Sequence, residues 1–183
     1  MTEDGASAVQ KVLTGIRRAD LNNEAAVERF LVDPCLEALG WHLVPRVNKQ
    51  VQLHFTPERA RFWRYSTGWM KRDYVFTRPQ LGPLHVEAKR RWGMKVSDLE
   101  GFLRRASSDD WAGSEGDGMW KDLALLLWGT RSQAGTRAAI VDDSRILVFD
   151  WTDRWSIRAQ EQIFDAPTTN VSAAFCLLSP SGQ

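Results

Sequence analysis

The first forty residues carry two apolar stripes with helical spacing. Because apolar residues that recur every three or four positions share one face of a helix, each stripe predicts an amphipathic helix that packs on a core. The second helix is expected to begin after a cap at 22–24, to bend or restart at Pro34 with Asp33 as a new N-cap, and to end at Gly40. The stripes consist of Val9, Val12, Leu13 and Ile16, and of Val27, Leu31, Cys35 and Leu39.

Alternation of apolar and polar residues replaces the helical period after residue 40 and predicts β-strands. Residues 41–55 show it weakly, through Val47, Val51, Leu53 and Phe55, and the aromatic, basic stretch 56–70 gives no assignment. Residues 73–76 and 84–89 read as two strands, and the link between them contains proline and glycine. These two strands predict a hairpin.

The second half of the chain mixes helix and strand signals. Ser97 and Glu100 have the spacing of a capping box, which predicts a helix with Leu99, Phe102, Leu103 and Ala106 on its faces. A polar, acidic loop at 107–118 and a buried helix at 120–128 are expected next. A second hairpin is expected from strands at 138–141 and 146–149, joined by a four-residue turn.

Length and composition predict one domain, and the mixed helix and strand signals place it in the α/β class. A chain of 183 residues with 43% hydrophobic content can fill one core. We expect N-terminal helices at 7–40, a central hairpin at 72–89, helices and a second hairpin at 97–150, and a C-terminal segment at 151–183 without an assignment. No run of eighteen apolar residues occurs, and the first ten residues are acidic, so a cytoplasmic protein without contact to a membrane is expected.

Charge is distributed unevenly, although the formal net charge is only +1. Residues 58–95 contain ten basic and three acidic residues, whereas the rest of the chain contains 14 basic and 20 acidic ones. A basic segment of this kind indicates a surface for nucleic acid, and a solvated charged face is the alternative. Cys35 and Cys176 lie in apolar surroundings without metal-ligand spacing, so both are expected to be buried thiols.

The central hairpin carries the candidate chemistry. Side chains alternate along a strand, so His85, Glu87 and Lys89 share one face. If the hairpin is symmetric about Gln80, Phe76 pairs with Leu84 and Asp73 pairs with Glu87. Two carboxylates then stand opposite each other and require a positive charge, for which a divalent metal is the natural candidate. Mg²⁺ prefers oxygen ligands and keeps several waters, which suits two carboxylates and a phosphate.

Asp73, followed fourteen residues later by Glu87-Ala88-Lys89, resembles the signature of the PD-(D/E)XK nucleases. The stretch NNEAAVERFLVDPCLEALGWHLVPRV, with RDYVF and LHVEAKRR, is similar to the N-terminal nuclease domain of type I restriction enzyme R subunits. The resemblance covers roughly residues 22–95. It implies a restriction-endonuclease-like core, with a central mixed β-sheet flanked by helices. It also implies a DNA endonuclease that depends on Mg²⁺, with Mn²⁺ as a substitute, and that acts in restriction or anti-phage defence.

The resemblance also implies a role for each site residue. Glu24 corresponds to a metal-binding glutamate on a helix before the sheet, Asp73 and Glu87 to the metal-binding acids, and Lys89 to the catalytic lysine that orients the attacking water. The expected nucleic-acid contacts are Arg72, Arg90, Arg91 and Lys95. Because the chain has no helicase motif, translocation would come from a separate helicase, ATPase or other defence-system subunit, and a homodimer is a further expectation.

The sequence departs from the family pattern at two places. Arg72 stands where the name of the motif has a proline. The helix expected from Ser97 lacks the glutamine and tyrosine that often follow in R-subunit domains and offers only Arg104 and Arg105. The second departure concerns a contact near the phosphate that is cut.

Less specific interpretations remain for the same residues. Asp73 and Lys89 could form a surface salt bridge, Glu24 could simply suit the helix dipole, and His85 could be a solvated strand histidine rather than a ligand. Arg90 and Arg91 could protect a sheet edge. Tryptophans in the basic segment could stack on bases or pack in the core, namely Trp63, Trp69 and Trp92. The alternatives to an endonuclease are therefore a silent nuclease-fold DNA-binding module and a structural subunit of an assembly.

Overall fold

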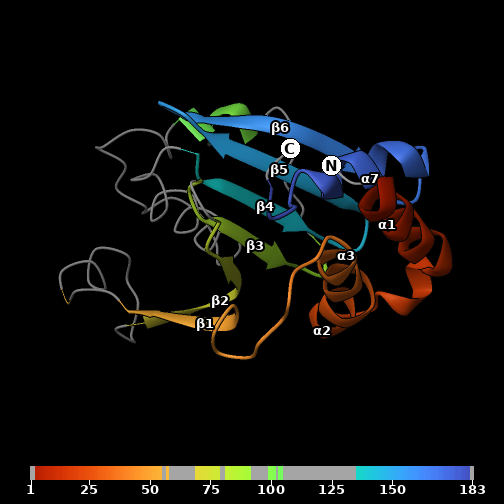
Figure 1. The fold of residues 1–183 in the computed structure, drawn as a ribbon, viewed down its shortest axis with the longest axis horizontal. Helices are drawn as coiled ribbons and strands as arrows, with labels where there is room; N and C mark the ends of the chain where they lie inside the picture. Colours follow the sequence, from red (N-terminus) through yellow and green to blue (C-terminus); the bar gives the residue numbers. More distant parts are fainter. Residues whose placement is uncertain are drawn as a thin grey trace.

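The computed structural model describes residues 3–54, 57, 69–78, 81–91, 99–101, 103–104 and 135–181. These residues form a six-stranded mixed sheet in the order β1-β2-β3-β4-β5-β6, flanked by helices (Figure 1). β3 and β4 are parallel, and the other neighbouring strands are antiparallel. The strands are β1 (Lys49–His54), β2 (Trp69–Phe76), β3 (Leu84–Ala88), β4 (Arg137–Val141), β5 (Arg145–Trp151) and β6 (Trp155–Gln162).

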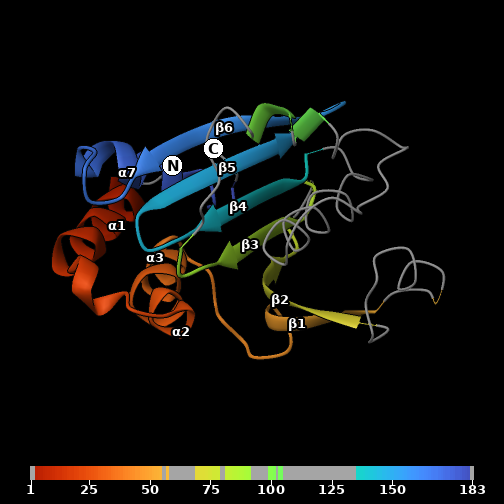
Figure 2. The ribbon, with the colours of Figure 1, turned by 180° about the vertical axis from the view of Figure 1, so that it is seen from behind.

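Helices α1, α2, α3 and α7 gather at one end of the sheet, as both views show (Figures 1 and 2). α1 packs against α7 and α3, and one buried cluster joins these helices to β2, β3, β4 and β5. The helical segments are α1 (Glu3–Gly15), a 3₁₀ turn η1 (Arg18–Asp20), α2 (Glu24–Val27), a π-helical turn η2 (Glu28–Val32), α3 (Asp33–Ala38) and α7 (Thr168–Cys176). Both helices predicted in the first forty residues are therefore confirmed.

The predicted restart of the second helix at Asp33 is wrong, because α2, η2 and α3 follow one another without a break. Asp33 has helical dihedral angles, and its N–H donates to the carbonyl of Glu28, five residues earlier. Proline has no N–H to donate, and the π turn ahead of Pro34 lets the helix change its hydrogen-bond spacing there. The Asp33 carboxylate does not cap the N-terminus of α3. It accepts a hydrogen bond of 2.7 Å from Tyr74 Oη instead.

The central hairpin has the predicted register, since Phe76 pairs with Leu84. β2 begins at Trp69, earlier than expected, because it also pairs with β1. The strand expected over 41–55 is partly wrong. Only Lys49–His54 is a strand, and Val47 lies in a turn with 69% of its surface exposed. Phe55 lies outside the described residues.

The second hairpin is confirmed as β4 and β5, with Asp142 accepting hydrogen bonds from the backbone N–H groups of Ser144 and Arg145 in the turn. The segment without a predicted assignment forms β6 and α7. Of the helix expected from Ser97, residues 99–101 and 103–104 are helical, with Leu99 and Leu103 buried. The loop expected at 107–118 and the helix at 120–128 lie outside the described residues.

One face of the central hairpin packs into the hydrophobic core. Leu84, Val86 and Ala88 are fully buried in it, as the alternation predicted. Cys35 and Cys176 are buried free thiols, and burial raises the pKa of both. Within the described ranges no helix is both long and apolar enough to cross a membrane.

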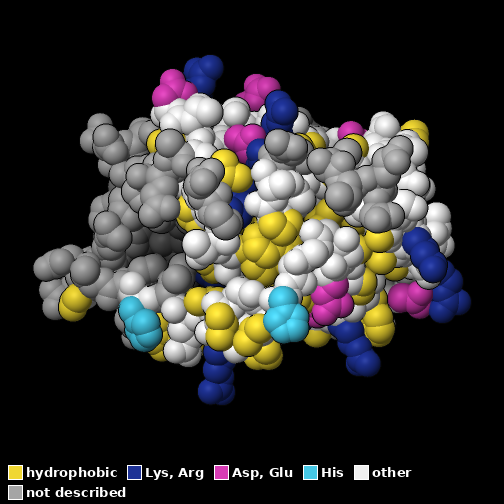
Figure 3. Space-filling model, viewed as in Figure 1, with side chains coloured by type: hydrophobic (Ala, Val, Ile, Leu, Met, Phe, Trp, Pro, Cys, Tyr) yellow, Lys and Arg dark blue, Asp and Glu magenta, His cyan; other side chains and the backbone are white. Residues whose placement is uncertain are grey.

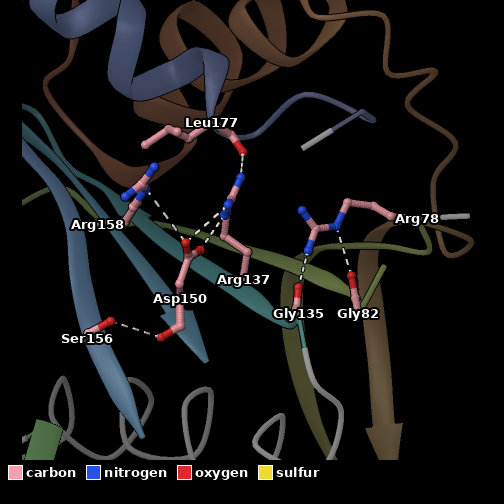
Figure 4. Close-up of polar contacts among 8 residues, drawn as sticks. All are labelled: Arg78, Gly82, Gly135, Arg137, Asp150, Ser156, Arg158 and Leu177. Carbon is pink, nitrogen blue, oxygen red and sulfur yellow. Dashed lines mark hydrogen bonds and ion pairs between the residues drawn. The ribbon is translucent and has the colours of Figure 1, made fainter. Parts of the chain in front are cut away.

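Two arginines hold the loops at the end of the sheet where β2 ends and β4 begins (Figure 4). Arg78 Nε donates to the carbonyl of Gly82 at 2.8 Å, and its Nη2 donates to that of Gly135. Arg137 pairs with Asp150 on β5 and donates to the carbonyl of Leu177 after α7. The backbones therefore approach closely here. An added Cβ at Gly82 would lie 2.3 Å from the backbone nitrogen of Thr136.

This approach predicts that Gly82→Ala destabilises the protein. The new methyl group would force the two backbones apart, at a cost of about 1–3 kcal/mol in the free energy of unfolding. Urea unfolding measures the change. Gly15→Ala is the matched control, because a Cβ there meets nothing within 4 Å, and helix propensity favours alanine by up to about 1 kcal/mol. Equal stability of the two variants would contradict the close approach.

Candidate functional site

The candidate site lies where the carboxyl end of β3 meets the start of α2. Glu87 is in β3, and Lys89 follows it, with its N–H bonded to the carbonyl of Val141 on β4 at 2.9 Å. Asp73 is in β2, and its carboxylate accepts a hydrogen bond of 2.9 Å from the N–H of Ala88. The neighbouring strands thus fix both the lysine and the aspartate.

The helix contributes glutamates to the same place. Glu24 is the first residue of α2, which begins there because Asn23 Oδ1 accepts the N–H of Ala26 at 2.9 Å. Glu28 follows one turn later on the same face. Glu24, Glu28 and Asp73 each offer a carboxylate oxygen, and these oxygens lie within 4.8 Å of one another. We call these three residues the acid cluster.

Two members of the acid cluster are buried, and the third is open to solvent. Glu28 and Asp73 are 9% and 6% exposed, whereas 47% of the Glu24 side chain is exposed. Two oxygens bound to one octahedral Mg²⁺ are about 3–4.2 Å apart, as bond lengths of about 2.1 Å require. A small contraction of the cluster would therefore suit a magnesium ion, with waters or a phosphate completing its coordination from the side of Glu24.

Glu87 is held beside the acid cluster by cations and is not one of the three converging carboxylates. Arg72 Nη1 lies 3.1 Å from one of its oxygens, and Lys89 Nζ lies 3.7 Å from the other. The pKa of Glu87 is raised to about 8, first by burial and then by the negative charge of Asp73, while Arg72 and Lys89 act to lower it. The buried carboxyl therefore holds a proton near neutral pH.

Glu28 is affected in the same way. Burial raises its pKa first and the charge of Asp73 second, while Lys49, Lys71 and a hydrogen bond from Gln50 act to lower it. In both carboxyls burial is the largest cause of the raised pKa and the charge of Asp73 the second. A divalent cation bound beside them would favour the ionised forms and displace the protons.

Lys89 lies between the two groups of acids. Its Nζ is 3.6 Å from Glu24 Oε2 and 3.7 Å from Glu87 Oε2, and only 17% of its side chain is exposed. The interpretation of Lys89 as half of an exposed pair with Asp73 is wrong, because both side chains are largely buried. The Lys89 ammonium group therefore borders both the acid cluster and Glu87.

Sequence reasoning missed Glu28 and the groups that support it. Lys49 bonds to Asp33 and lies 3.7 Å from Glu28, and Asp33 is fixed in turn by Tyr74. The spacing of Glu28, four residues after Glu24, was a usable signal. The contribution of Lys49 was not visible, because it depends on how β1 packs against the helix.

The expected nucleic-acid contacts separate into three cases. Arg72 is 1% exposed and binds Glu87, so we assign it to the site rather than to nucleic acid. Arg90 and Arg91 are exposed just after Lys89, and Arg91 lies 3.8 Å from Asp143 with 83% of its side chain exposed. Lys95 lies outside the described residues.

The structure also shows the surroundings of His85 and of one of the three tryptophans. The interpretation of His85 as a solvated histidine is wrong, since the residue is buried. Burial, Arg72 and Arg78 lower its pKa to about 3, so the imidazole is neutral. Trp69 is 38% exposed on β2, and Trp63 and Trp92 lie outside the described residues.

No family model, curated protein or solved structure matches the chain. What can be said of the site therefore comes from its own geometry and charge.

The raised pKa of Glu87 predicts how stability depends on pH when no metal is present. The folded state keeps a proton that the unfolded chain releases above pH 4.5, so the free energy of unfolding falls as pH rises from about 4.5 to about 8. Glu87→Gln, which mimics the neutral carboxyl, is expected to reduce this decrease in the free energy of unfolding by on the order of a few kcal/mol. Urea unfolding in a chelator at several pH values measures it.

The control is Glu37→Gln, because Glu37 is exposed on α3. It keeps the wild-type pH dependence. A Glu87→Gln variant that follows the wild-type curve would show that Glu87 is ionised throughout.

Proposed function

We propose that the protein is a metal-dependent nuclease that hydrolyses phosphodiester bonds in DNA. The observation that carries the proposal is the acid cluster with Lys89 beside it. Oxygen ligands from Glu24, Glu28 and Asp73 suit Mg²⁺ or Mn²⁺, and a lysine at 3.6 Å from Glu24 provides a positive group next to the bound ion. The mixed sheet and the glutamate-bearing helix that precedes it support a restriction-endonuclease-like core.

Each residue has a definite part in the proposed reaction. The metal, when bound, lowers the pKa of a water and stabilises negative charge on the phosphate. Glu24, Glu28 and Asp73 would hold the ion, and Lys89 would orient the attacking water and interact with the developing charge. The water oxygen forms a bond to phosphorus and gives up a proton to solvent, the opposite phosphorus–oxygen bond breaks, and the leaving oxygen takes a proton from solvent. Glu87 keeps Lys89 in place through its second oxygen.

The surroundings of the site support a polyanionic substrate. Arg90 and Arg91 are exposed immediately after Lys89 and can contact phosphates that flank the cut. The proposal includes a role in restriction or anti-phage defence, with DNA translocation supplied by a separate helicase or ATPase subunit. That part rests on the sequence resemblance to type I restriction enzyme R subunits.

A second candidate is a nuclease-fold subunit that binds DNA without cutting it. It is favoured by the contact of Arg72 with one oxygen of Glu87, which leaves that oxygen less available to a metal ion. In that case the cluster would bind a metal and DNA without turnover. Cleavage of a plasmid distinguishes the two candidates.

Metal dependence is the first prediction of the nuclease proposal. Plasmid DNA is expected to be cut in Mg²⁺ or Mn²⁺, to stay intact in a chelator, and to be protected when Ca²⁺ competes, because the looser coordination of Ca²⁺ orients the water poorly. Gel electrophoresis of supercoiled plasmid measures the reaction. The control is the Asp73→Ala variant, purified in the same way. Cleavage in a chelator would reject the mechanism, and no cleavage with any of these metals would favour the second candidate.

Lys89→Ala and Asp73→Ala are predicted to abolish cleavage for different reasons. Loss of Lys89 removes a positive charge beside the acids, so Mn²⁺ binds at least as tightly, while the cleavage rate falls by at least about 100-fold. Loss of Asp73 removes an oxygen ligand, so Mn²⁺ affinity falls by about tenfold or more. Calorimetric titration of Mn²⁺ and plasmid cleavage measure the two effects.

The matched controls are Lys11→Ala on α1 and Glu37→Gln on α3, both at exposed positions away from the site. They are expected to leave metal binding and cleavage unchanged. If folded Lys89→Ala loses Mn²⁺ as severely as Asp73→Ala, the lysine supports the metal site and does not act on the water.

A further inference from the structure

The antiparallel ribbon of β1 and β2 has one exposed face that the proposed site does not use. In the observed register Gln52 pairs with Lys71 and His54 pairs with Trp69. Side chains of such pairs lie on the same side of a sheet, and all four residues are exposed. The residues that alternate with them are less accessible, since Arg72 is buried and Val51 is partly buried. We call Gln52, His54, Trp69 and Lys71 the ribbon face.

The ribbon face leads to the acid cluster. The next position along β2 on this face is Asp73, and the strand opposite it carries Gln50, between the pairs Lys49–Tyr74 and Val51–Arg72. Gln50 has a positive φ of 56°, which breaks the regular pairing at this point. Its side chain bonds to Glu28, and the charge of Lys71 is felt at Glu28. The two surfaces are therefore continuous.

The chemistry of the ribbon face fits a nucleic-acid strand. Lys71 supplies a positive charge, and among the described residues no acidic side chain lies within ion-pair distance of it. Gln52 and His54 add hydrogen-bonding groups, and Trp69 adds an aromatic ring that is 38% exposed. Histidine and Lys or Arg side chains are seen at the rim of the molecule beneath β1 (Figure 3). Aromatic rings combined with cations are typical of surfaces that bind unpaired strands.

We propose that the ribbon face binds an unpaired segment of DNA and guides that strand into the acid cluster. The inference rests on the proposed nuclease function and specifies its substrate. A base stacks on Trp69, and Lys71 contacts a phosphate between that base and the site. Four residues of strand separate Trp69 from Asp73, which is about 13 Å, so the stacked base and the cut phosphate belong to one short stretch. A duplex would offer Trp69 no free base, because its bases are stacked and paired.

Binding to a fluorescently labelled oligothymidylate of about 15 nucleotides tests the proposal, since this length fills a single-strand site. Anisotropy titrations are made in a chelator, so that no cleavage is needed, and are repeated with a duplex of the same length. Trp69→Ala is expected to weaken single-strand binding by roughly tenfold or more. Lys71→Ala is expected to weaken it about three- to tenfold and to reduce the salt slope by about 0.7.

Matched controls separate these effects from general damage. Lys11→Ala removes an exposed lysine from α1, and Phe30→Ala removes an aromatic ring that is 45% exposed on the helix. Both are expected to bind the oligonucleotide as the wild type does. Unfolding curves of all four variants show whether the fold is kept.

Each outcome decides the inference separately from the nuclease proposal. Weaker single-strand binding in Trp69→Ala and Lys71→Ala alone supports the ribbon face, even if no metal gives cleavage. If the wild-type protein cleaves DNA but neither substitution weakens single-strand binding, the ribbon-face proposal is overturned and the nuclease proposal stands. Loss of duplex binding alone also overturns it, because the ribbon would then be a duplex surface.

Discussion

The crowding of four carboxylates at the end of β3 is the constraint on which the other features of this region depend. Removing carboxylates from water is costly unless cations and hydrogen bonds compensate, and Glu87 is compensated by Arg72 and Lys89 inside the protein. Loss of one partner from a buried pair costs about 3–5 kcal/mol in general. Even so, the pKa values of Glu87 and Glu28 stay raised. Burial is the main cause of both shifts, and a cation bound as proposed would favour the ionised carboxylates.

The protein supplies this compensation from elements that are distant in sequence. The helix brings two glutamates, β2 brings Asp73 and Arg72, and the end of β3 brings Lys89, whose backbone is held by β4. Lys49 on β1 reaches the helix through Asp33, and Tyr74 fixes Asp33. The same strands carry the ribbon face away from the site. Charge balance, strand pairing and the path proposed for the DNA strand are therefore properties of one small part of the sheet.

Much of this could be predicted from the sequence, because it is local. Alternation and the turn residues between 76 and 84 determine the hairpin register, so the positions of Asp73 and Glu87 followed from it. Burial and partner choice are not local. Arg72 looks like a surface cation in a basic segment, yet tertiary packing encloses it against Glu87, and His85 is enclosed in the same way. β6 and α7 were also missed, because β6 keeps polar residues on its exposed side and α7 is buried without a clear stripe.

The wide turn at Glu28–Val32 separates two functions within one helix. Glu24 lies before the turn and Glu28 is its first residue, and both face the strands, whereas the residues after it bury Cys35 and Leu36 in the core. A regular helix advances by about 100° per residue, whereas the wider π turn advances by less and so takes up an extra residue without turning the two halves relative to each other. The turn therefore lets one continuous helix keep its carboxylates toward the strands and its apolar side chains toward the core.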